Sequence, residues 1–104
     1  MSQTKTDTQT KIRPNESLRE PPFFRVLYLN DNATTCEFVI ESLMEHFNYT
    51  LDTAQQITLD IHQDGSACVA VLPYELAEQK GIEITTQARA QSFPLQIKLE
   101  PQTE

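Results

Sequence analysis

A chain of 104 residues has room for one domain with a single modest hydrophobic core. Residues 1–20 carry a net charge of +1, and the rest of the chain, with four basic and twelve acidic side chains, carries −8. An acidic body argues against nucleic acid as a partner, because binding to a phosphate backbone depends on Lys and Arg, and it suits a cationic ligand or partner.

The first part of the chain differs from the rest in composition. Residues 1–21 are rich in Thr, Gln and Lys, and after the first residue only Ile12 and Leu18 are large and apolar. Such a segment buries too little surface to offset its ordering entropy, so we expect a flexible, disordered N-terminal extension followed by one domain over residues 22–104. The extension lacks the apolar run of a secretory signal, and no later segment approaches membrane-spanning length. The sequence therefore predicts a cytoplasmic protein without membrane contact.

The first predicted elements of the domain are a strand and a helix joined by a turn. Residues 23–29 are aromatic and aliphatic enough for a central strand. Residues 30–33 include three Asx side chains, which favour a turn. Thr34 and Glu37 fit a capping box that opens a helix, and apolar positions then recur at helical spacing as far as Phe47.

Four further elements are predicted in the rest of the chain. They are a helix over residues 51–62, a strand over 67–72, a helix over 75–88 and a strand over 95–100. Gly65 lies in the turn that ends the first of these helices, and Pro73 suits the first turn of the next. The order β-α-α-β-α-β favours an α+β fold, in which a three-stranded antiparallel sheet packs against three helices.

Three polar residues are candidate ligands for a free α-amino group: Asn30 and Asp31 after the first strand, and His62 near the end of the second helix. An ammonium group offers three donors and a positive charge, and an amide oxygen, a carboxylate and a neutral imidazole nitrogen are matching acceptors. Val39 and Ile61 are apolar residues that could wall a pocket beside them. Each polar residue also has a structural interpretation, since Asn and Asp form turns and histidines near helix C-termini often contact the last carbonyls.

One segment and three later stretches together resemble a known family. Residues 25–39 read RVLYLNDNATTCEFV, and they are followed in order by IHQDGSA at 61–67, ELAEQK at 75–80 and Pro-Leu at 94–95. This ordered set resembles the ClpS adaptors, in which a strand runs into Asn-Asp-Asp and then Thr-Pro-Met-Glu-Phe-Val. The resemblance covers residues 22–100.

The resemblance implies an adaptor that is not an enzyme. No cofactor or metal is expected, and a monomer is the simplest expectation. Such a protein recognises N-degrons, which are proteins with a bulky hydrophobic first residue, and delivers them to a ClpA- or ClpC-type AAA+ unfoldase that works with the ClpP protease. The matching positions fall into three groups. Asn30, Asp31 and His62 would hold the α-amino group, Cys36, Val39, Thr58, Ile61 and Leu95 would line the side-chain pocket, and Glu75 and Lys80 would dock on the N-terminal domain of the unfoldase. The extension would engage the unfoldase during hand-over.

The chain departs from the family pattern at five positions. Ala33 and Thr35 replace a common aromatic residue and proline, and the other three departures concern the proposed site. Asn32 stands where the family usually has a second Asp, Cys36 replaces the usual Met at the gate of the pocket, and Thr58 replaces an apolar residue, often Met. The last two changes make the pocket roomier or more polar. Because the gate Met crowds β-branched first residues, we expect Cys36 to admit Ile and Val.

Two other functions stay open from the sequence. Cys36, His62 and Asp31 could form a thiol hydrolase, although no nucleophile elbow or oxyanion motif surrounds the cysteine. The chain could also be a regulator that binds the unfoldase without N-degron selectivity. A metal site from His46 and His62 is disfavoured by their wide separation, and without CxxC spacing Cys36 and Cys68 are predicted to be reduced thiols that act as small apolar residues.

Overall fold

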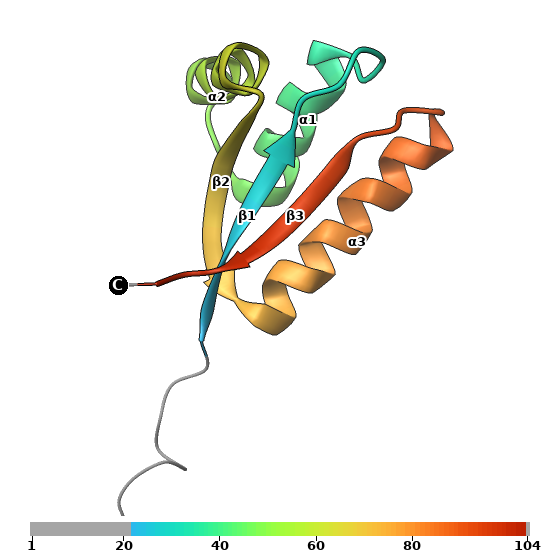
Figure 1. Ribbon diagram of the computed structural model, residues 1–104. Coiled ribbons are helices and arrows are strands. Elements are labelled where there is room, and N and C mark those ends of the chain that lie inside the picture. The colour runs from blue at the N-terminus through green and yellow to red at the C-terminus, as the bar shows by residue number, and fades with distance from the viewer. Residues whose placement is uncertain (1–21, 104) are drawn as a thin grey trace, which may run out of the picture.

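The computed structural model describes residues 22–103, so the predicted extension over residues 1–21 lies outside the described residues. Six elements follow one another in the predicted order (Figure 1). They are β1 (Phe23–Leu29), α1 (Cys36–Phe47), α2 (Leu51–Asp64), β2 (Ser66–Pro73), α3 (Tyr74–Ala90) and β3 (Gln96–Pro101). The predicted α+β fold, a three-stranded antiparallel sheet with three helices, is confirmed.

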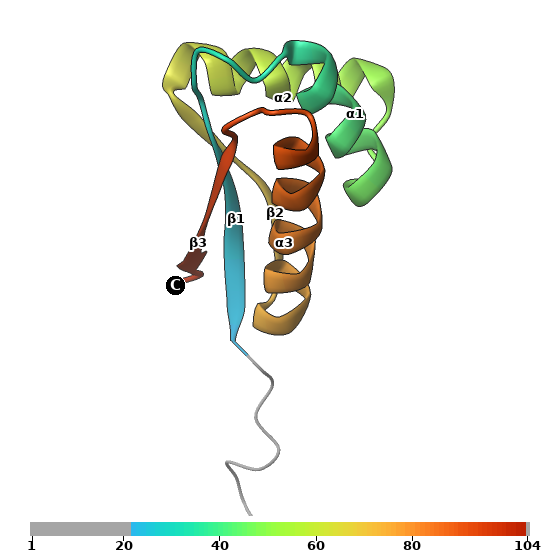
Figure 2. The same ribbon diagram turned by 90° about the vertical axis from the view of Figure 1, so that its right-hand side faces the viewer.

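The sheet is centred on β1, with β2 on one side and β3 on the other. Both neighbours run antiparallel to β1, and its middle residues Val26 and Tyr28 are fully buried. The helix α3 runs along one face of the sheet and contacts all three strands, whereas α1 and α2 lie at the end where β1 stops and β2 begins (Figure 2). The core lies between these layers, with Leu43 from α1 and Ile84 from α3 at its centre.

The start of α1 differs from the predicted capping box by one residue. Thr35 is the N-cap, and its hydroxyl accepts the backbone N–H of Phe38 at 3.1 Å. A capping box needs a Glu or Gln three residues after the N-cap, and with Thr35 as the cap that position is Phe38, not Glu37. Thr34, the predicted cap, instead donates its hydroxyl to the Asp31 carboxylate at 2.7 Å.

Other boundaries differ from the prediction by one or two residues. The helix α2 continues to Asp64 and ends at Gly65, whose φ of 88° is in the left-handed region that glycine tolerates. Pro73 is the N-cap of α3 rather than part of its first turn, and β3 begins at Gln96 rather than Leu95. No helix within residues 22–103 combines the length and apolar character needed to cross a membrane.

The helices α1 and α3 are joined through His46. Its side chain is only 7% exposed, with Nε2 3.0 Å from Oε1 of Gln87 and Nδ1 3.6 Å from Oε1 of Glu83. Both ring nitrogens therefore face α3. This histidine serves helix packing and is not paired with His62.

Candidate functional site

The turn after β1 is tied to the C-terminal end of α2. The backbone N–H of Asn30 donates to the carbonyl of Gly65 at 2.9 Å, and the N–H of Gly65 donates to the carbonyl of Ile61. The strand register places Leu29 opposite Ser66, so β1 ends where α2 passes into β2. This arrangement brings the polar residues after β1 close to the last turn of α2.

A cavity of about 280 Å³ opens between this turn and the helices α1 and α2. Its lining residues are Asn30, Asp31, Asn32, Thr34, Cys36, Val39, Thr58, Ile61 and His62. All the residues expected to bind the amino group are among them, as are four of the five expected in the side-chain pocket. The fifth, Leu95, is a core residue with 1% exposure and does not line the cavity.

The lining of the cavity changes from exposed and polar to buried and largely apolar. Asn30 and His62 are exposed, and Asp31 is half-buried. In contrast, Val39, Thr58 and Ile61 are buried, with Thr58 the polar member of this group. Such a concave site, with a few convergent polar groups beside an apolar wall, is typical of small-ligand binding.

The Asp31 carboxylate organises the turn at the mouth of the cavity. Its Oδ1 accepts the backbone N–H groups of Ala33 at 2.8 Å and Thr34 at 2.7 Å, and its Oδ2 accepts the Thr34 hydroxyl. Partial burial opposes ionisation, but these hydrogen bonds, together with the positive charge of Arg89, outweigh it and lower the pKa of Asp31. Asp31 is therefore both a turn former and a fixed negative charge at the cavity.

Two lining residues, Asn32 and Thr34, were not predicted as site residues, and Thr34 has a clear structural role there. Its hydroxyl and N–H hold the Asp31 carboxylate in place. The signal was present as a hydroxyl residue three positions after an Asx residue, a spacing typical of local side-chain to backbone hydrogen bonding.

Both cysteines are free thiols, as predicted. Cys36 is the first residue of α1 and lines the cavity, and Cys68 lies on β2. Both are exposed, so neither packs as a small apolar residue in the core, contrary to the prediction.

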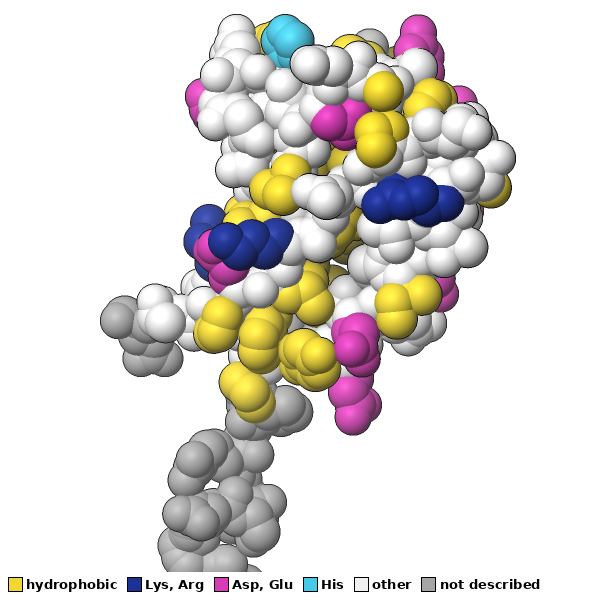
Figure 3. Space-filling view, turned by 45° about the vertical axis from the view of Figure 1, so that its right-hand side comes forward, with side chains coloured by type: hydrophobic (Ala, Val, Ile, Leu, Met, Phe, Trp, Pro, Cys, Tyr) yellow, Lys and Arg dark blue, Asp and Glu magenta, His cyan; other side chains and the backbone are white. Residues whose placement is uncertain are grey.

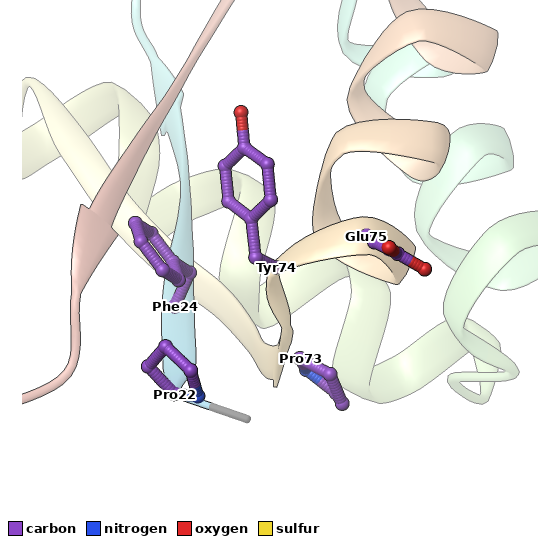
Figure 4. A pocket seen from close by; sticks show the side chains of 5 residues that line it. All are labelled: Pro22, Phe24, Pro73, Tyr74 and Glu75. Carbon is purple, nitrogen blue, oxygen red and sulfur yellow. The ribbon is translucent and has the colours of Figure 1, made fainter. Parts of the chain in front are cut away.

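A second hollow, of about 550 Å³, lies at the opposite end of the sheet, where β1 begins and β2 ends. Pro22, Phe24, Pro73, Tyr74 and Glu75 line it (Figure 4). The rings of Phe24 and Tyr74 meet edge to face with centroids 4.9 Å apart, and Glu75 lies on the side away from Phe24. Of the two residues expected to dock on an unfoldase, Glu75 thus lines this hollow, and Lys80 lies further along α3.

Further exposed apolar side chains lie on the three elements that meet at this end of the sheet. Phe23, Val71 and Leu76 are each about 40% exposed, and Figure 3 shows apolar side chains gathered at the lower end of that face of the molecule. We call these three residues and the five that line the hollow the apolar end.

The chain matches a known family over most of its length. The family model described as ATP-dependent Clp protease adaptor protein ClpS matches residues 19–98. A Campylobacter jejuni protein named ATP-dependent Clp protease adapter protein ClpS is 40% identical over 100 residues, which cover 96% of this chain and 98% of that protein. A Wolinella succinogenes protein of the same name is 36% identical over 95 residues, covering 91% and 93%. The chain belongs to the ClpS family.

A solved ClpS structure has the same fold. Agrobacterium tumefaciens ClpS2 bound to L-phenylalaninamide superimposes with a TM-score of 0.77 at 35% identity, covering 80% of this chain and all of that one. The resemblance drawn from residues 22–100 is thereby confirmed, and the chain is a Clp protease adaptor by family. An adaptor is not itself a protease, which is consistent with the expectation that this ClpS protein is not an enzyme.

Proposed function

We propose that this ClpS protein binds the free N-terminus of proteins whose first residue is bulky and hydrophobic. It acts in the cytoplasm as a monomer and delivers them to a ClpA- or ClpC-type AAA+ unfoldase for degradation by ClpP. The observation that carries the proposal is the cavity of about 280 Å³, which joins a polar mouth to a largely apolar wall.

The mouth of the cavity supplies acceptors for an α-ammonium group. A carboxylate has about four lone-pair sites, and Asp31 uses two at Oδ1 and one at Oδ2, so Oδ2 keeps one for a ligand. The amide oxygen of Asn30 and a neutral His62 nitrogen complete the set. Each charge-assisted hydrogen bond contributes about 1.5–3 kcal/mol.

The buried wall of the cavity suits the side chain of the first residue. Val39 and Ile61 supply apolar surface, Thr58 lies beside them, and Cys36 lies at the rim. The Agrobacterium relative was solved with L-phenylalaninamide, a compound that combines a free α-amino group with an apolar aromatic side chain. These are the two features that this cavity is proposed to recognise, with Leu95 supporting the wall from the core.

Delivery is assigned to the apolar end. Glu75 lies in its hollow and Lys80 on the same helix, so α3 would present both to the N-terminal domain of the unfoldase. Pro22, where the predicted extension joins the domain, also lines the hollow. The extension is therefore attached beside the proposed docking surface, which suits a role in hand-over.

The test is fluorescence anisotropy with peptides that differ only at position one: Phe, Leu, Ile and Arg, with N-acetyl-Leu as the matched control. Acetylation removes the charge and the ammonium donors but keeps the side chain. We expect micromolar or tighter binding, about −8 kcal/mol, for the free-amine apolar peptides and none for the acetylated or Arg peptides. Equal binding of all five peptides contradicts the proposal.

A regulator without N-degron selectivity is the second candidate. It is favoured by the separation of the apolar end from the cavity, because docking on the unfoldase would not need a competent cavity. Binding of the unfoldase N-terminal domain, with no binding of any free-amine peptide, would establish it.

A further inference from the structure

The buried wall of the cavity contains a hydroxyl group. Within residues 22–103 the buried serine and threonine residues are Ser42 and Thr58, and Thr58 lines the cavity. A buried hydroxyl without a full set of partners is unfavourable, so its hydrogen bonds decide which ligands suit it.

The two buried hydroxyls differ in their hydrogen bonding. Ser42 donates to the carbonyl of Val39 at 2.8 Å, and its oxygen lies 2.8 Å from the hydroxyl of Tyr28, which can therefore donate to it. Thr58 donates to the carbonyl of Ala54 at 2.7 Å, which commits its hydrogen, and no donor from residues 22–103 reaches its oxygen. The Thr58 oxygen thus has lone pairs free and can act toward a ligand only as an acceptor.

Thr58 and His62 mark the inner and outer parts of the cavity along α2. They are four residues apart, so they lie on the same face of the helix with Cβ atoms about 5–6 Å apart. His62 is exposed, whereas Thr58 is 8% exposed. A first residue whose amino group lies at the mouth therefore directs its side chain inward, toward Thr58.

We propose that Thr58 makes tyrosine the preferred first residue by accepting a hydrogen bond from its phenol. This specificity rests on the proposed function of the cavity. A tyrosine places its donor at the far end of a rigid ring, and phenylalanine has the same ring without the donor. Phenylalanine offers no donor to the free lone pairs of the Thr58 oxygen, and a site that can hydrogen-bond a substrate hydroxyl discriminates against the analogue without it.

The first experiment uses the full chain and peptides that carry Tyr, Phe or 4-methylphenylalanine at position one, with N-acetyl-Tyr as control. The methyl group matches the phenol oxygen in size but cannot donate. We expect the Tyr peptide to bind about 3- to 10-fold more tightly than the Phe and 4-methylphenylalanine peptides, the range of one net hydrogen bond. Tighter or equal binding of 4-methylphenylalanine would show that size, not the donor, sets the preference, and would overturn the inference.

The second experiment compares two variants. Thr58→Val has nearly the same shape but no acceptor, so the buried phenol loses its partner and Tyr should bind about 3-fold or more weakly than Phe. Thr58→Ser keeps the hydroxyl and should keep Tyr ahead of Phe. A Tyr-to-Phe ratio that Thr58→Val leaves unchanged would overturn the role of Thr58.

The controls separate this inference from the proposed function. If acetylation abolishes binding while Tyr and Phe peptides bind equally, the cavity binds N-termini and Thr58 does not select among them. If the acetylated Tyr peptide binds as tightly as the free one, the amino-group site itself is wrong. The ranking in the unaltered chain tests the inference even if Thr58→Val fails to fold.

Discussion

The two ends of the sheet present two kinds of surface. Where β1 ends, Asp31 and its neighbours line a small cavity with several polar groups at its mouth. Where β1 begins, the hollow is larger, about 550 Å³ against 280 Å³, and it is lined by prolines and aromatic rings with a single carboxylate, Glu75. A few convergent polar groups are suited to one small charged group, whereas an apolar patch with a polar rim is suited to a protein surface.

This difference follows from how each end is built. At the cavity, a turn and a helix C-terminus meet, and both leave polar groups that point outward from the backbone. At the apolar end, Pro73 stops β2 and starts α3 without a side-chain cap hydrogen bond. The side chains there are mainly proline and aromatic rings, which offer few hydrogen-bond donors and acceptors. If the two surfaces are functionally separate, a substitution that weakens binding at one should leave binding at the other unchanged.

The largest expected effect comes from Asp31→Ala. It removes the charge that would bind the ammonium group and the acceptor that holds Thr34 and Ala33, so affinity for a free-amine Leu peptide should fall about 100-fold or more. Binding to the unfoldase N-terminal domain should be unchanged. Anisotropy measures both, and Asp31→Asn, which keeps an oxygen for the turn, is the control. A parallel loss of unfoldase binding would show that the two ends are not functionally separate.

The reciprocal change is Tyr74→Ala at the apolar end. Exposed aromatic residues dominate many protein interfaces, so unfoldase binding should weaken about 30-fold, while peptide affinity stays the same. Tyr74→Phe is the matched control, because it loses only the hydroxyl that donates to Glu78 at 3.0 Å. The same loss in both variants would assign the effect to the Glu78 contact and not to the ring.

The order of elements and the cavity residues could be predicted because they depend on local pattern and on recognisable motifs. Periodicity placed all six elements, and the residues Asn30, Asp31 and His62 do come together in space. The N-cap of α1 was misplaced because Thr34 and Thr35 both fit it. The Thr34 hydroxyl donates to the Asp31 carboxylate instead, and Thr35 caps the helix.

The apolar end as a surface could not be predicted in the same way. Its residues Phe24 and Tyr74 are fifty positions apart, and only the strand register that pairs Phe23 with Pro73 brings them together. Hydrophobic alternation assigns a residue to a face of its strand but does not give the partner across the sheet. Leu95 was expected at the pocket from the family resemblance, but it is a core residue with 1% exposure and is not among the residues that line the cavity.

A pH titration tests the amino-group site at the cavity separately from the apolar end. If a neutral His62 accepts from the ammonium group, its protonation removes that acceptor and adds a like charge, so peptide affinity should fall between pH 8 and 5.5. Asp31 does not contribute in this window. Its pKa is lowered on folding, so its stabilising hydrogen bonds are fully present above its ordinary range and are lost only as the pH falls through the lowered value.

The control for this titration is His62→Gln, which should bind more weakly at pH 8 but lose most of the pH dependence. None of the residues that line the hollow of the apolar end is a histidine, so docking there should change less over the same range. A flat peptide affinity in the unaltered chain would rule out the acceptor role of His62.

The smallest expected effect concerns the rim of the cavity. Cys36 is exposed at the first position of α1 and lines the cavity beside Val39, so a longer side chain there would project over the opening. Cys36→Met should therefore lower the affinity for Ile and Val peptides about 5-fold or more relative to Leu, since one or two methyl-sized groups change binding by about 1–3 kcal/mol. Cys36→Ser, which keeps the size, should leave the Ile-to-Leu ratio unaltered. If Cys36→Met lowers the affinities for Ile, Val and Leu equally, the rim restricts access in general and does not discriminate against side chains branched at Cβ. Selectivity must then come from the buried wall.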